Sequence, residues 1–182
     1  ETEFICADYH SVEAIGLAYL ANDEPALEVH RSGKDSYRVA ASDMFNRPYD
    51  SFDKECMERQ IGKVRELSMG YGGGIGAYAN MAGGYNIDLE TLPPFIMPYA
   101  TADELDGKYG AVALAKSYIA RNPDSMSLDA AIACDVIKRK WRVQHEASVA
   151  WWKQLELAAF SAVQNPGNVY PAGPVKYLVD GP

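Results

Sequence analysis

Arg59, Lys63, Leu67 and Tyr71 recur every four residues in one segment of this 182-residue chain. On an α-helix that spacing puts them along one face, and a helix over these residues would be about 18 Å long. Two cations at one end of such a face can hold phosphate groups, and an aromatic ring at the other end can meet a sugar and a base. The spacing therefore predicts a face that binds a nucleoside triphosphate. The alternative is a solvated amphipathic helix that ends at a glycine.

A carboxylate lies upstream of this segment, at the end of an apolar run. Residues 4–7 predict a buried strand, Asp8 follows them, and residues 11–20 predict a helix. Magnesium prefers one or two carboxylates together with substrate phosphates to a cage built wholly from protein ligands. Taken alone, Asp8 is more simply a helix N-cap, but together with the cationic face it predicts a metal-binding carboxylate.

Both segments resemble sequence motifs of family A, or polymerase-I-like, DNA polymerases. The run Asp8-Tyr-His-Ser-Val-Glu13 is similar to the first polymerase motif of that family. The pattern Arg59-x3-Lys63-x7-Tyr71-Gly72 is similar to the second motif. The sequence of residues 62–74 is especially similar to the bacteriophage branch of the family. Two looser stretches, within residues 33–45 and 141–152, agree with the resemblance in the expected order.

The resemblance implies a role in catalysis or metal binding for several residues. Asp8 and the backbone carbonyl of Tyr9 would hold magnesium, with two Mg²⁺ ions in the complete enzyme. Arg59 and Lys63 would bind the triphosphate of an incoming deoxynucleoside triphosphate (dNTP) and stabilise its charge in the transition state. By this resemblance Asp8 and Lys63 are the expected catalytic residues.

The resemblance also implies how the sugar and base would be recognised. Tyr71 would lie against the nascent base pair, and Leu67 stands where the family usually has Phe or Tyr, which keeps apolar contact but loses ring stacking. Glu13 would hydrogen-bond to Tyr71 and close the space beside the sugar C2′, which disfavours a ribonucleotide. Single-subunit RNA polymerases share the second motif but carry a small residue in place of Glu13, so Glu13 favours DNA synthesis. Ile15 departs from the arginine that many members have at its position.

A second catalytic carboxylate of the family, in a later His-Asp dipeptide, has no counterpart in this sequence. The dipeptide His145-Glu146 has the nearest chemistry, but the pattern around it predicts a helix surface. The chain begins without Met and ends where a strand is starting, so we expect a piece of a longer polymerase that cannot transfer nucleotides alone. Its expected partners are dNTP, primer-template DNA and the remainder of the polymerase chain, and exposed apolar faces could also pair two copies.

The expected fold class is α+β, predominantly α. Residues 1–50 would form part of the palm, residues 51–166 a helical fingers subdomain, and residues 167–182 a strand starting back toward the palm. The three prolines within residues 92–98 predict a loop there. Besides residues 11–20, helices are predicted over residues 24–29, 35–45, 52–70, 77–81, 109–121, 128–140 and 147–163, and a strand over residues 175–179.

Composition limits the function classes without choosing among them. The net charge of −8 argues against a nucleic-acid binder, but cations gather locally within residues 54–65 and 138–142. The second group fits a solvated helix end as well as a contact to the template backbone. Three scattered cysteines without C-x-x-C spacing predict neither a disulfide framework nor a zinc site, and we expect reduced thiols in a cytoplasmic protein. No apolar stretch approaches the roughly 20 residues that span a membrane.

Two other function classes fit parts of the sequence. Gly72-x-Gly74-x-x-Ala77 matches a variant of the dinucleotide-binding fingerprint of Rossmann-type domains, but that motif requires a strand immediately before it. Residues 63–69 instead have helical spacing and good helix formers. The other class is a non-catalytic helical interaction module, such as a processivity or scaffold part derived from a polymerase, in which Asp8→Ala would leave the function of the intact protein unchanged. Separately, Trp141, Trp151 and Trp152 are expected to serve packing rather than base stacking.

Overall fold

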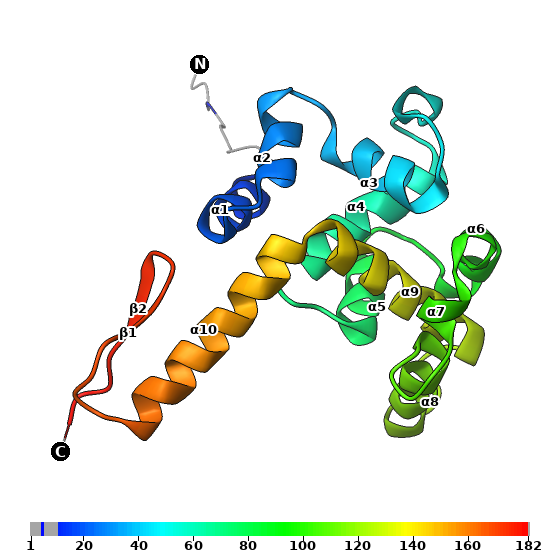
Figure 1. Ribbon diagram of the computed structural model, residues 1–182. Helices are drawn as coiled ribbons and strands as arrows, with labels where there is room; N and C mark the ends of the chain where they lie inside the picture. The colour runs from blue at the N-terminus through cyan, green and yellow to red at the C-terminus, as the bar shows by residue number, and fades with distance from the viewer. Residues whose placement is uncertain (1–4, 6–10, 182) are drawn as a thin grey trace.

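The computed structural model describes residue 5 and residues 11–181, and it is predominantly helical with one short antiparallel hairpin (Figure 1). The predicted α+β, predominantly α class is confirmed. The α-helices are α1 (Val12–Ala21), α2 (Glu24–Arg31), α3 (Ser36–Phe45), α4 (Met57–Met69), α5 (Ile75–Gly84), α6 (Pro93–Ile96), α7 (Ala102–Leu105), α8 (Ala111–Arg121), α9 (Leu128–Gln144) and α10 (Glu146–Gln164). The 3-10 helices are η1 (Tyr49–Ser51), η2 (Leu89–Thr91) and η3 (Met97–Tyr99), and the strands are β1 (Tyr170–Ala172) and β2 (Val175–Tyr177).

The hydrophobic core lies where α4, α5 and α9 pack together. Ile61 of α4, Tyr78 of α5 and Ile137 of α9 are fully buried. Residues 130–138 of α9 are buried all the way around the helix, as expected for a helix that crosses the centre of a domain. Trp141 near the end of α9 is also buried, and its ring stacks on that of Trp152 with centroids 5.4 Å apart. Trp141 therefore serves packing, as predicted.

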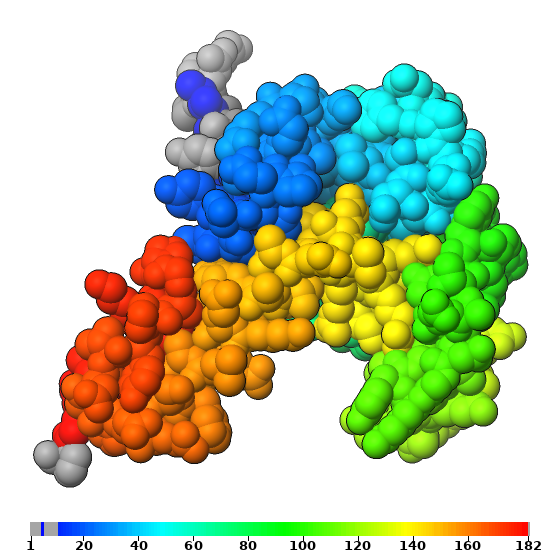
Figure 2. Space-filling view, viewed as in Figure 1, coloured from blue at the N-terminus to red at the C-terminus, as the bar shows by residue number. Residues whose placement is uncertain are grey.

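The outline is an arch, in which α9 joins one leg formed by α10 to another formed by α8 (Figure 2). The chain bends at His145, which ends α9 and begins α10, because its backbone angles (φ −114°, ψ 48°) are not helical. The hairpin packs along α10, where Trp151 Nε1 donates a hydrogen bond to the carbonyl of Ala172 at 3.2 Å. In the hairpin, Ala172 lies opposite Val175.

Most predicted elements are present at nearly the predicted positions. Each predicted helix within residues 11–163 overlaps an observed one, and the strand predicted over residues 175–179 corresponds to β2. The strand predicted over residues 4–7 lies outside the described residues except for Ile5, which belongs to no regular element. Across residue 5 and residues 11–181, no helix combines the length and apolarity needed to cross a membrane.

Three local predictions are wrong. The loop expected over residues 92–98 is instead α6 followed by η3, because the prolines occupy the first helical positions, where a missing N–H costs no hydrogen bond. The helix predicted over residues 52–70 begins only at Met57, since Cys56 has an extended backbone and acts as the N-cap. The helix surface expected at His145 is a mostly buried junction between two helices.

Candidate functional site

Helix α4 carries the repeating side chains found in the sequence. Arg59, Lys63 and Leu67 lie within it, one turn apart. The helix ends at Met69, so Tyr71 lies in the turn that follows, where its side chain is 75% exposed. The first three of the four residues therefore share a helical face as predicted, whereas Tyr71 extends from the turn after the helix.

Arg59 is bound to a carboxylate from the neighbouring helix. Its Nε and Nη2 atoms both lie 2.8 Å from Oδ2 of Asp35, and its Nη1 donates to the carbonyl of Lys54 at 3.3 Å. The guanidinium carbon lies 5.3 Å from the centre of the Tyr37 ring. Because the side chains of Arg59 and Asp35 are only 15% and 23% exposed, this pair is less screened than an ordinary surface ion pair.

Lys63 lies against two tyrosine rings. Its Nζ is 4.4 Å from the centre of the Tyr85 ring and 5.8 Å from that of Tyr37. Both distances are within the range of a favourable cation–π contact. Burial, with Tyr85 and Asp35 nearby, raises the pKa of the Tyr37 hydroxyl, so the ring between the two cations stays neutral.

A cavity of about 770 Å³ opens beside this part of α4. Leu67 and Tyr71 line it from one side and Glu13 of α1 lines it from another, while Tyr37 and Tyr85 connect it to the two cations. Its volume is within the range of small-molecule sites, and its lining combines apolar and aromatic side chains with a few polar groups. Further apolar lining comes from Leu17, Leu20, Val29, Val39, Trp151 and Trp152.

A buried group of ionisable side chains borders the same cavity. His145 Nδ1 lies 3.2 Å from Oδ2 of Asp23, which also accepts from the Ser148 hydroxyl at 3.0 Å, and His145 Nε2 lies 3.6 Å from Oε2 of Glu66. Burial alone would lower the pKa of His145, but the two carboxylates outweigh it and raise the pKa to about 9. Burial likewise opposes ionisation of Asp23 and Glu66, yet the nearby His145 lowers the pKa of both carboxyls.

The structure brings together some of the predicted site residues. Arg59, Lys63, Leu67, Tyr71 and Glu13 lie around one cavity or on rings that line it. Although both residues are described, no hydrogen bond joins Glu13 to Tyr71 in this structure. Two further predicted residues, Asp8 and Tyr9, lie outside the described residues. Within residues 11–181 and at residue 5, no three His, Cys, Asp or Glu side chains gather as metal ligands would.

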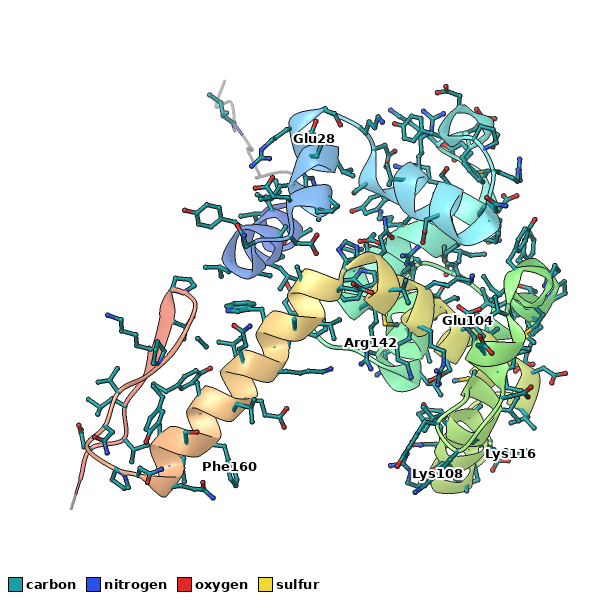
Figure 3. All side chains as sticks on the ribbon, viewed as in Figure 1. Glu28, Glu104, Lys108, Lys116, Arg142 and Phe160 are labelled. Atoms are coloured by element: carbon teal, nitrogen blue, oxygen red, sulfur yellow. The ribbon has the colours of Figure 1, made fainter. Side chains whose placement is uncertain are left out.

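The basic group at residues 138–142 is largely used within the protein. Lys138 and Arg139 both bind Asp135, and Lys140 lies 3.6 Å from Glu104. Only Arg142 among these cations is exposed (Figure 3). Most of this cluster therefore stabilises the packing of α9 rather than presenting charge to solvent.

Sequence reasoning missed three contributors to the site. Asp35 binds Arg59 from 24 residues away, Tyr85 covers Lys63 from 22 residues away, and Glu66 faces the histidine at the helix junction. Asp35 could have been recognised as the N-cap of α3, since it precedes a helical pattern. Its contact with Arg59 depends on how α3 packs against α4, which no short-range pattern reveals.

The Rossmann-type alternative is wrong for this segment. The glycine-rich run 72–74 follows the helix α4, whereas a dinucleotide-binding fingerprint follows a strand. Gly72 has φ +74°, and this left-handed conformation lets the chain turn sharply between α4 and α5. The glycines therefore serve a turn between helices.

Comparison with known proteins yields one informative similarity. The chain is 38% identical over 104 residues to a DNA polymerase of Bacillus phage SP02. That stretch is 56% of this chain but only 16% of the phage protein, so the similarity covers a small part of that relative's length. No protein-family model matches the chain, and no solved structure matches it.

Proposed function

We propose that this chain is the nucleotide-binding part of a DNA-directed DNA polymerase of family A, with residues 1–50 from its palm and residues 51–166 as its fingers. The observation that carries the proposal is the arrangement around α4. Two cations one turn apart lead to Leu67 and Tyr71 at the edge of a cavity, and Glu13 lines the same cavity. The similarity to a phage DNA polymerase supports the same conclusion from sequence and favours DNA synthesis over RNA synthesis.

In this proposal the chain's own residues bind and orient the dNTP. Arg59 and Lys63 hold the triphosphate, because guanidinium and ammonium groups form short, charge-assisted hydrogen bonds with phosphate oxygens. Leu67 and Tyr71 contact the base or the nascent base pair at the other end of the cavity. Glu13 faces the sugar and disfavours a 2′-hydroxyl, whose polar group would be crowded and poorly paired.

Magnesium would be held by Asp8 and the carbonyl of Tyr9, together with ligands from the rest of the polymerase. When bound, two such ions neutralise phosphate charge and activate the primer 3′-hydroxyl for phosphoryl transfer. The described residues contribute the phosphate-binding cations and the cavity. Primer-template DNA and the remainder of the polymerase chain complete the proposed assembly, and the 182 residues alone should not add nucleotides.

A binding titration tests the proposal. The chain should bind a fluorescent N-methylanthraniloyl derivative of dATP in the presence of magnesium, and Lys63→Ala should weaken that binding about tenfold or more, because it removes a direct phosphate contact. Lys116→Ala is the matched control, since Lys116 is exposed on α8, remote from the cavity (Figure 3). No saturable binding, or equal losses in both variants, would contradict the proposal.

A further inference from the structure

Asp35 already forms an ion pair with Arg59, one of the two cations that the proposed function assigns to phosphate. A single carboxylate oxygen, Oδ2, accepts from both Nε and Nη2 of Arg59 at 2.8 Å. Phosphate oxygens would use these same N–H groups of the guanidinium. In the structure as it stands, Asp35 therefore takes the geometry of a phosphate oxygen at Arg59 and cancels its charge locally.

Several contacts fix the position of this carboxylate. Its other oxygen, Oδ1, caps α3 by accepting from the backbone N–H groups of Tyr37 at 3.0 Å and Arg38 at 3.4 Å. The backbone N–H of Asp35 donates to the hydroxyl of Tyr49 at 3.0 Å. The carboxylate therefore cannot leave easily, so a ligand that reaches Arg59 must share or replace its bonds while Asp35 stays nearby.

Arg59 keeps unused N–H groups that a phosphate could bind. A guanidinium has five N–H groups, and the structure commits Nε, Nη2 and Nη1 to Asp35 and Lys54 through one contact each. Each terminal nitrogen therefore keeps a second N–H. Lys63, one turn further along α4, has no carboxylate within ion-pair distance among the described residues, and its Nζ lies against the rings of Tyr37 and Tyr85.

We propose that Asp35 is an internal competitor of the nucleotide triphosphate: it holds Arg59 when the site is empty and opposes phosphate binding by its charge. This inference rests on the proposed function, because it concerns the same phosphate site. Asp35 acts through Arg59 and is a positioning residue. Because of Asp35, the triphosphate binds more weakly than it would to the two cations alone. The bound triphosphate can therefore dissociate more readily.

Asp35→Asn tests the inference with little change in shape. Asparagine caps helices as well as aspartate does, so α3 should keep its N-terminus, but the charge is lost and the amide N–H₂ group can face Arg59. The variant should bind magnesium-dATP about three- to tenfold more tightly at low ionic strength, and the gain should shrink at high salt because charge effects are screened. Deoxyadenosine, which has no phosphate, should bind the two proteins equally.

Two further variants separate this role from a general change in charge. Asp88→Asn removes the same charge from another helix-capping aspartate, which accepts from the backbone N–H of Glu90 at 3.0 Å and binds no arginine among the described residues. It should leave the dATP affinity unchanged. In an Arg59→Gln background, Asp35→Asn should give no gain, because the competitor and its cation act as a pair.

The outcomes distinguish this inference from the proposed function. Tighter binding by Asp35→Asn that disappears in the Arg59→Gln background supports it. If the unmodified chain binds magnesium-dATP and Lys63→Ala weakens that binding, but Asp35→Asn brings no gain or brings a loss, the inference alone is overturned. A gain that persists without Arg59 overturns it as well. Failure of the unmodified chain to bind at all removes the proposed function and this inference together.

Discussion

The two cations of α4 that the proposal assigns to phosphate have different partners in the structure. Arg59 is neutralised by Asp35, whereas Lys63 rests on the rings of Tyr37 and Tyr85. A cation that contacts rings and has no paired carboxylate loses little when a phosphate approaches. Lys63 is therefore the residue whose loss should matter most directly for phosphate binding.

Glu13 supplies a prediction at the same scale. Under the proposed function, Glu13→Ala should reduce the preference for dATP over ATP about threefold or more, because removal of the carboxylate would leave space beside the sugar C2′. The measurement is the ratio of the two dissociation constants in the presence of magnesium. Glu28→Ala serves as the control, since Glu28 is exposed on α2 and does not line the cavity (Figure 3). An unchanged ratio in Glu13→Ala would argue against sugar selection by this carboxylate.

The sequence predicted single residues well where a local spacing carried the information. Arg59, Lys63 and Leu67 share a face because a helix repeats nearly every four residues, which follows from sequence alone. The ion pair between Arg59 and Asp35 joins residues 24 positions apart, and its existence depends on tertiary packing. Local patterns therefore identified the cations but not the groups that hold them.

Helices α3 and α4 make the most extensive helix–helix contact among the described residues, and Gly62 lies in that contact. A Cβ at Gly62 would lie 2.6 Å from the carbonyl oxygen of Tyr37, a backbone atom that cannot move without shifting α3. Gly62→Ala should therefore destabilise the protein by about 1–3 kcal/mol.

Thermal unfolding of two glycine variants checks this prediction. Gly83→Ala is the control, since Gly83 also lies in a helix, α5, but a Cβ there would meet no atom within 4 Å. Alanine is the better helix former, so this variant should be as stable as the unmodified chain or gain up to about 1 kcal/mol. Equal melting temperatures for Gly62→Ala and Gly83→Ala would mean that α3 and α4 are not in close contact.

The junction of α9 and α10 makes stability depend on pH. Asp23 precedes α2, Glu66 belongs to α4, and both face His145, whose pKa they raise to about 9 from an ordinary value of 6.5. The charged histidine thus stabilises the fold fully below about pH 6.5, and this contribution is lost as the pH rises through about 9. The two carboxyls, whose pKa values are lowered, contribute above their ordinary values and lose their effect in acid.

His145→Gln should remove this dependence. The unmodified chain should lose melting temperature, by roughly 5 °C or more, between pH 6.5 and pH 9. The variant should melt lower at pH 6.5 and change much less over the same interval, because glutamine has no proton to lose. Parallel pH profiles for the two proteins would show that the histidine is not held in its charged form.

At the scale of elements, sequence reasoning succeeded for helices with clear apolar spacing and failed where one residue changed the local geometry. Three prolines within residues 92–98 predict a loop from sequence alone, yet proline is compatible with a first helical turn. His145 lies within a helical pattern but ends one helix and begins the next. Its side chain contacts Asp23 and Glu66, which are distant in sequence, and a local pattern does not reveal such contacts.

The whole molecule presents surfaces that suit a larger assembly. Leu157, Phe160 and Val163 recur on α10 and are 67%, 62% and 66% exposed, and Phe160 projects from the helix on the side away from the hairpin (Figure 3). Exposed apolar groups of this size commonly mark an interface. Under the proposed function, the remainder of a polymerase chain would cover this side of α10.

The central claim is that nucleotide binds along α4 and in the adjoining cavity. The most direct test is a series of ¹H–¹⁵N correlation spectra of the isotopically labelled chain, recorded as magnesium-dATP is added. The account predicts that the largest shift changes fall on Tyr37, Arg59, Lys63, Leu67 and Tyr71, with little change in α8. Saturable changes confined to α8 or the hairpin, with α4 unaffected, would contradict it.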